Sequence, residues 1–136
     1  MDKTNVQANF TIIANVLDHI EVSSVLGIEP SYIRHSNEVL NNGRLFGHDE
    51  WGIGTEYEES LDINDQLKKI TDAVYDKTAI VNEVCEKFHA KCHFLIVVNV
   101  ENGEFPAMYF ESDFIKFATS INAEIGFDPY FLSNCE

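Results

Sequence analysis

Basic residues are scarce in this chain. Lys and Arg together number 9 against 23 Asp and Glu, which gives a formal net charge of −14 over 136 residues. Proteins that bind DNA or RNA neutralise phosphates with clustered Lys and Arg, and anionic membrane surfaces attract the same residues. The sequence has no basic patch. Its composition therefore argues against nucleic acid and against a membrane as partners.

Long apolar segments and export signals are also missing. The longest apolar run, 94–98, is far shorter than the roughly 20 residues that a membrane-spanning helix needs. The first residues lack the basic start and apolar stretch of a secretory signal. Cysteines are few and odd in number, which favours reduced thiols over a disulfide framework at Cys85, Cys92 and Cys135. We therefore expect a cytoplasmic protein.

What the chain does contain is typical of an ordered globular protein. Hydrophobic residues make up 45% and charged residues 24% of the sequence, close to the average for folded domains. The length fits one domain, residues 1–136, with an ordered core at about 8–132. No internal repeat or linker divides it.

Short elements separated by turn signals fill the chain. Apolar runs rich in β-branched and aromatic residues predict strands at 9–14, 51–57, 94–100, 105–110 and 123–131. Helical spacing of apolar residues predicts helices at about 19–26, 63–74, 79–90 and 112–121. We expect Asp18, Asp62 and Ser112 to be N-caps and Gly27 a C-cap.

The order of these elements predicts the fold class. Asn102-Gly103 favours a tight turn, so that 94–100 and 105–110 are expected to form a hairpin. Two-sided burial places 94–100 near the centre of the sheet. We therefore predict an α+β fold, a mostly antiparallel sheet with helices packed on one face as a two-layer sandwich.

A combination of local patterns resembles one family. A first strand is followed by Val-Leu-Gly-Ile-Glu-Pro at 25–30, by a strand opening with Trp-Gly-Ile at 51–53, and by the helix entry Ser-Leu-Asp-Ile-Asn-Asp-Gln-Leu at 60–67. With the closing strand–helix–strand of 107–131, the chain resembles the small bacterial proteins of the domain of unknown function 4279 family over about residues 8–132. The resemblance implies a stand-alone, single-domain bacterial protein and implies no activity or functional residue.

An acidic stretch suggests a binding role. No basic residue occurs between Arg44 and Lys68, where the acidic residues are Asp49, Glu50, Glu56, Glu58, Glu59, Asp62 and Asp65. A solvated surface that only keeps the protein soluble explains the stretch, and so does a docking face for a basic partner. Our leading hypothesis is a non-enzymatic, acidic protein-binding module. An immunity or inhibitor protein for a basic partner such as a nuclease toxin is one instance.

Two alternatives stay open. The irregular segment 31–50 offers side chains for a small-ligand or metal pocket or for an enzyme's active site, namely Arg34, His35, Arg44, His48 and Trp51. Homodimerisation through 105–110 or 123–131 is the other, because aromatic residues are numerous there.

Known catalytic and metal motifs are not recognisable. Cys85, His89, Cys92 and His93 are residue types that zinc binds, but Cys92 and His93 are adjacent at a strand start and point to opposite faces. A Cys–His nucleophile pair among them lacks a third, orienting residue. We therefore predict no catalytic residue, no metal and no cofactor.

Overall fold

The computed structural model describes residues 3–132, which form one sheet and a layer of helices. The strands are β1 (Asn5–Ala14), β2 (Tyr32–Arg34), β3 (Asp49–Gly54), β4 (Glu58–Glu59), β5 (Lys91–Glu101) and β6 (Glu124–Leu132). The helices are α1 (His19–Leu26), α2 (Ile63–Val74), α3 (Thr78–Phe88) and α4 (Ser112–Ser120), with a 3-10 turn, η1 (Tyr75–Lys77), between α2 and α3. None of these helices is long and apolar enough to cross a membrane.

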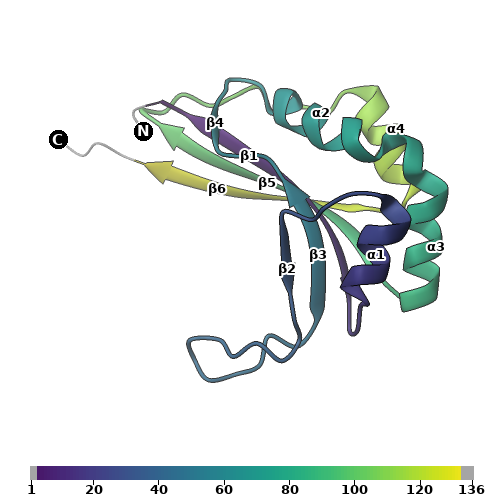
Figure 1. Ribbon diagram of the computed structural model, residues 1–136. Coiled ribbons are helices and arrows are strands. Elements are labelled where there is room, and N and C mark those ends of the chain that lie inside the picture. Colours follow the sequence, from purple (N-terminus) through teal and green to yellow (C-terminus); the bar gives the residue numbers. More distant parts are fainter. Residues whose placement is uncertain (1–2, 133–136) are drawn as a thin grey trace.

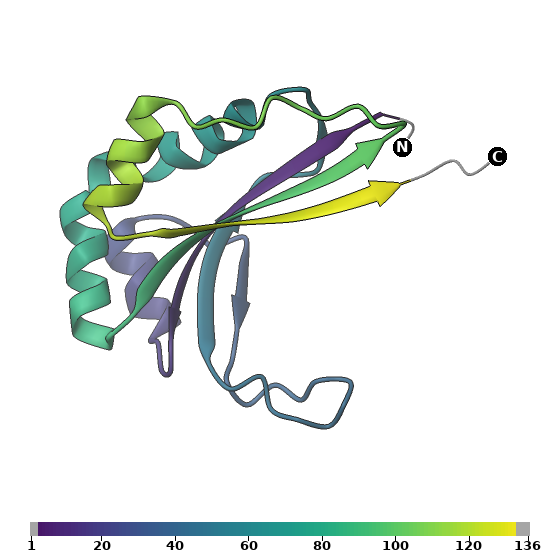
Figure 2. The same ribbon diagram turned by 180° about the vertical axis from the view of Figure 1, so that it is seen from behind.

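The sheet is antiparallel except at one pair of strands. Its order is β2-β3-β1-β5-β6, and β4 also pairs with β1. Only β5 and β6 of the described strands run parallel, because α4 carries the chain back between them. All the helices lie on the same face of the sheet, while the other face carries none of them (Figures 1 and 2). The predicted α+β sandwich is confirmed, although β1 rather than β5 is its middle strand.

Alternation along the central strands builds the core between sheet and helices. Every second side chain of β1 and β5 points to the helices and is fully buried, including Phe10, Ile12, Phe94 and Ile96. From β3, Trp51 enters the same layer opposite Ile12. The helices add their own buried apolar side chains: Val22, Leu26, Leu67, Ile70, Val74, Val81, Phe114 and Phe117.

The predicted caps at Asp18, Asp62 and Gly27 are present. The predicted cap at Ser112 is wrong, because Ser112 is the first residue of α4 and Glu111 takes the N-cap position without a side-chain hydrogen bond. The Asp18 side chain accepts a hydrogen bond from the Glu21 backbone N–H (3.0 Å) and so begins α1. Gly27 ends that helix in the left-handed region at φ 67°, which a residue without a Cβ adopts at little cost. These two residues therefore determine where α1 begins and where it ends.

The predicted hairpin of 94–100 with 105–110 is wrong. The turn itself forms, with positive φ at Asn102 and Gly103, but its ladder ends at the single Glu101–Glu104 bridge. Pro106 has no N–H to donate, and the chain leaves the sheet there. The place beside β5 is taken instead by β6.

Gly52 allows a close approach on the face without helices. The Tyr32 ring lies where a Cβ at position 52 would be, and its hydroxyl hydrogen-bonds to Thr11 Oγ1. Because a methyl group there would displace the ring and break that bond, Gly52→Ala should lower the free energy of unfolding by about 1–3 kcal/mol.

A double-mutant cycle with Tyr32→Ala tests this cause in urea denaturation. With the ring removed, the glycine substitution should cost less than half as much. An equal cost in both backgrounds would show that the ring is not the obstacle.

Candidate functional site

Asp62 and Asn64 begin α2, and Asn64 also binds a segment that lies far along the chain, at 109–111. Asp62 Oδ1 accepts hydrogen bonds from the backbone N–H (2.9 Å) and from Nδ2 (3.0 Å) of Asn64. Asn64 is only 5% exposed; its Nδ2 also donates to the Tyr109 carbonyl (2.9 Å), and its Oδ1 accepts from the Glu111 N–H (3.3 Å). The buried amide therefore holds 109–111 against the helix start.

Ala107 strengthens this junction. Its N–H donates to the Leu61 carbonyl (2.7 Å), and its carbonyl accepts from the Ile63 N–H (3.2 Å). The segment between β5 and α4 consequently crosses the start of α2 instead of extending the sheet. Figure 2 shows it passing from the end of β5 across the start of α2 to α4.

Apolar side chains stay exposed where the two segments meet. Leu61 is 59%, Tyr109 52% and Met108 42% exposed. Three carboxylates lie on the same segments, and none of them forms a salt bridge with another described residue. We call this group the acidic tyrosine surface: Leu61, Asp62, Asp65, Met108, Tyr109 and Glu111.

The phenol reports the negative potential of this surface. The pKa of Tyr109 is raised above its ordinary value. The largest cause is the negative charge of Asp62, followed by slight desolvation of the phenol and then by the charges of Glu111 and Asp65. The three carboxylates disfavour a further negative charge at the hydroxyl. The same potential favours a cation placed beside the ring.

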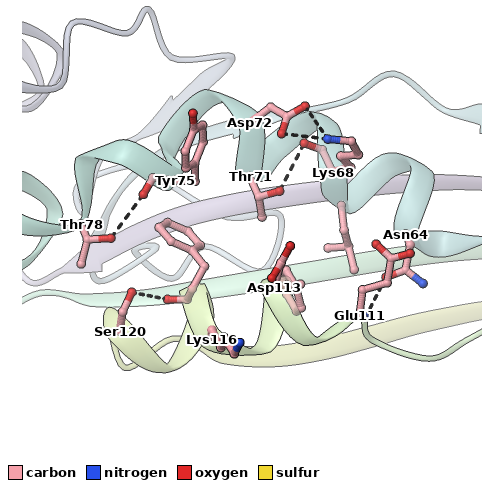
Figure 3. Close-up of a pocket in the computed structure, with 13 residues that line it drawn as sticks. Asn64, Lys68, Thr71, Asp72, Tyr75, Thr78, Glu111, Asp113, Lys116 and Ser120 are labelled. Atoms are coloured by element: carbon pink, nitrogen blue, oxygen red, sulfur yellow. Dashed lines mark hydrogen bonds and ion pairs between the residues drawn. The ribbon is translucent and has the colours of Figure 1, made fainter.

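The acidic tyrosine surface continues into a groove between α2 and α4. The groove has a volume of about 600 Å³, and Leu67, Phe114 and Phe117 lie along its apolar base. Asn64 and Glu111 lie together at one end of it, and Tyr75, Thr78 and Ser120 at the other (Figure 3).

The groove offers contacts rather than an activated nucleophile. Thr71, Thr78 and Ser120 each donate their hydroxyl to a backbone carbonyl three residues earlier. Lys68 and Asp72 pair with each other on the exposed side of α2. None of the described residues that line it is a histidine or a cysteine, so none of them is an imidazole base for these hydroxyls.

The predicted acidic stretch does not form one face, and Asp49 is not part of a surface. Asp49 is 7% exposed; its carboxylate accepts from the backbone N–H groups of Leu17 (2.8 Å) and Ser36 (2.7 Å). Its inclusion in the docking face is wrong, because it ties two loops to the start of β3. Glu50, on the opposite side of the strand, accepts from His48 Nε2 (2.9 Å).

The other predicted acidic residues follow the far end of β3. The negative charge of Glu58 is paired with the Lys69 ammonium (2.5 Å). The hydrogen bond from Lys69 and then the one from Gln66 Nε2 (3.0 Å) lower the pKa of the Glu58 carboxyl. Glu56 and Glu59 are exposed, with no salt bridge to a described residue. With Asp62 and Asp65 placed above, the stretch splits into a group beside the 35–48 loop and a group at the start of α2 (Figure 1).

Side chains of the 31–50 segment contact one another. The Arg34 guanidinium lies 3.9 Å from the centre of the Phe46 ring and pairs with Glu38 (2.9 Å). The His35 ring packs edge-on against His19, with ring centres 4.6 Å apart. These contacts hold side chains of the loop against one another and against α1.

Trp51 was wrongly grouped with that segment. Its side chain is fully buried among the core residues, and its Nε1–H donates to Ser23 Oγ (2.9 Å). His48 instead packs on Phe46 with ring centres 4.3 Å apart, and Arg44 is exposed on the loop. The predicted ligand set is therefore spread over the loop and the core.

The cysteine and histidine cluster also separates. Cys92 points into the core, whereas His93 lies against Gly126 on the opposite face of the sheet. His89 ends α3 in the left-handed region at φ 53°. Within residues 3–132, no group of three or more His, Cys, Asp and Glu side chains is arranged to hold a metal ion.

A family model described as a domain of unknown function (DUF4279) matches residues 3–132. The chain belongs to the DUF4279 family. No curated protein and no solved structure matches this DUF4279 chain at a significant level.

Four of the six residues of the site on this DUF4279 domain were missed from the sequence. Met108, Tyr109 and Glu111 carry no motif, and 105–110 was assigned to a strand. Pro106 was the available signal, since a proline there weakens the case for a paired strand. Nothing local indicates that Ala107 pairs with a segment more than forty residues earlier.

Proposed function

We propose that this DUF4279 protein is a non-enzymatic binding module whose acidic tyrosine surface docks onto a basic surface of another protein. The observation that carries the proposal is the clamp of Asn64 and Ala107 on 107–111, which leaves Tyr109 exposed among three carboxylates without ion pairs to described residues. The proposal keeps Asp62 and Asp65 from the acidic stretch and adds residues from the 104–111 segment.

The composition of the surface suits recognition of Lys and Arg. Tyr and Met are enriched at the cores of protein interfaces, where rigid or adaptable apolar groups supply contact area. A Lys or Arg side chain can lie over the Tyr109 ring while its charge faces Asp62 or Glu111. The net charge of −14 adds long-range attraction, which speeds association with a cationic partner at low salt.

The groove beside the surface extends the contact area. Its apolar base of Leu67, Phe114 and Phe117 can take an apolar side chain next to the basic residues. The partner class is therefore a folded protein that presents Lys or Arg beside an apolar group. The cationic face of a nuclease is one such surface, and an inhibitor that covers it is one form of this function.

Site-specific cross-linking tests the proposal. A photo-reactive amino acid replaces Met108 in one variant and the exposed Glu83 of α3 in a control variant, and both are irradiated in lysate of the host at low and high salt. We expect a basic protein to cross-link through position 108 at low salt only. Cross-linking that is equal at both positions, or absent at 108, would overturn the proposal.

Charge reversal on the surface should weaken the complex with the protein so identified. Asp65→Lys with Glu111→Lys should raise its Kd at least about tenfold, because two attractive charges become repulsive. Asp62 is left intact because it caps α2. The measurement is calorimetric titration at low salt, with circular dichroism to verify folding.

A matched control separates the surface from net charge. Glu83→Lys with Glu86→Lys makes the same change in charge on exposed positions of α3. This control should keep most of the affinity. Equal losses in both double variants would show that only the overall charge matters.

A further inference from the structure

Two thiols from different elements are in contact. Cys85 lies in the last turn of α3 and Cys92 near the start of β5, with their sulfur atoms 3.5 Å apart. The turn between them is tight: Ala90 donates its N–H to the Cys85 carbonyl (2.9 Å), and His89 adopts a left-handed conformation. A disulfide needs the sulfurs at about 2.05 Å, so the two sulfur atoms must come closer by about 1.5 Å for the bond to form.

The two sulfurs have unequal surroundings. Cys92 is 1% exposed and packs in the core, whereas Cys85 is half-buried and packs against the core from α3. The hydrogen bond from the Cys92 thiol lowers the pKa of Cys85. The same bond, together with burial, raises the pKa of Cys92. Cys85 is accordingly the better nucleophile. The Cys92 thiol lies beside it, where it can react with Cys85 once Cys85 is oxidised.

We propose that Cys85 and Cys92 are a redox-active pair that a hydroperoxide converts to a reversible intramolecular disulfide. The Cys85 thiolate attacks one oxygen of hydrogen peroxide, the O–O bond breaks, and Cys85 sulfenic acid and hydroxide form. The Cys92 sulfur then attacks the Cys85 sulfur, the S–O bond breaks and the S–S bond forms. The oxygen leaves as water with the proton of the Cys92 thiol. In sum, two thiols and one peroxide give one disulfide and two waters.

The fold should tolerate this link. The sulfurs already touch, and the bond joins the end of α3 to β5 across the tight turn, without changing which residues face the core. Reduction by a small thiol such as glutathione would restore the pair. This inference does not depend on the proposed binding function, because both cysteines lie outside the acidic tyrosine surface.

Mass spectrometry of a Cys135→Ser variant tests the pair, since Cys135 lies outside the described residues. After treatment with hydrogen peroxide, the folded monomer should lose two hydrogen atoms in mass and become unreactive to iodoacetamide. Dithiothreitol should reverse both changes, and the far-ultraviolet circular dichroism should not alter.

Two further variants in the same background separate the roles. With Cys92→Ser, Cys85 should gain oxygen atoms, because the sulfenic acid has no thiol to condense with. With Cys85→Ser, the buried Cys92 should stay unmodified at the same dose. A parent variant that gains oxygen instead of losing hydrogen, or that forms only disulfide-linked dimers, would overturn the proposal.

Discussion

Trp51→Ala should lower the free energy of unfolding by about 3–5 kcal/mol, the usual cost of removing a large aromatic side chain from a core. Trp51 is the largest of the fully buried side chains and lies opposite Ile12 on the middle strand of the sheet. A domain of this size is stable by only about 5–15 kcal/mol. The substitution should therefore remove a large share of the total stability, measured by urea denaturation followed with circular dichroism.

Trp51→Phe separates packing from hydrogen bonding. Phenylalanine keeps much of the ring volume but loses the bond from Nε1 to Ser23 Oγ (2.9 Å). Because the half-buried Ser23 hydroxyl can turn to solvent, the loss should be about 1–2 kcal/mol, well below that of the alanine variant. A cost below 1 kcal/mol for Trp51→Ala would contradict the role of this residue as the core anchor of β3.

The elements that local signals specify were predictable from the sequence. Asp18, Gly27 and Asp62 cap helices where capping chemistry places them. The apolar run at 94–98 predicted an inner strand, and β5 lies between β1 and β6 in the sheet. In each case, the residue type and its immediate neighbours determine the conformation.

Pairings between distant segments were not predictable. A tight turn at 102–103 is compatible with a hairpin, yet Ala107 finds its partners at Leu61 and Ile63. β2 was missed because three residues are too few to show a period, and it forms only beside β3. Which segments pair depends on which partner satisfies the backbone N–H and C=O groups at the lowest free energy of the whole fold.

Only two of the six residues of the candidate site were predictable, for the same reason. Charge is visible in composition, so Asp62 and Asp65 were identified in the acidic stretch. Whether a carboxylate is free to bind a partner depends on the hydrogen-bond donors around it, and these come from other segments. The backbone N–H groups of Leu17 and Ser36 bind the Asp49 carboxylate, and Lys69 pairs with Glu58. Homodimerisation through 123–131 stays a prediction; β6 lies at the edge of the sheet with most of its side chains exposed.

Asp49→Ala should lower the free energy of unfolding by about 2–4 kcal/mol at neutral pH, because two backbone donors lose a charged acceptor in a buried place. Those donors, Leu17 and Ser36, belong to the loop before α1 and to the loop between β2 and β3. Asp49→Asn should cost somewhat less, since one amide oxygen still accepts a bond. Asp76→Asn, an exposed change on η1, is the control and should have almost no effect.

The cost of Asp49→Asn should depend on pH with a definite sign. Burial acts to raise the pKa of Asp49, but the hydrogen bonds from Leu17 and Ser36, with the nearby His19, outweigh it and lower the pKa of the folded protein. A carboxyl with a lowered folded pKa stabilises the fold above its unfolded pKa of about 3.9, and this stabilisation is lost as the pH falls through the folded value. The difference in unfolding free energy between wild type and Asp49→Asn should thus be present at about pH 5 and above and shrink below about pH 4. Urea denaturation across this range measures it, and a difference that grows in acid would show that Asp49 is not held as a buried carboxylate.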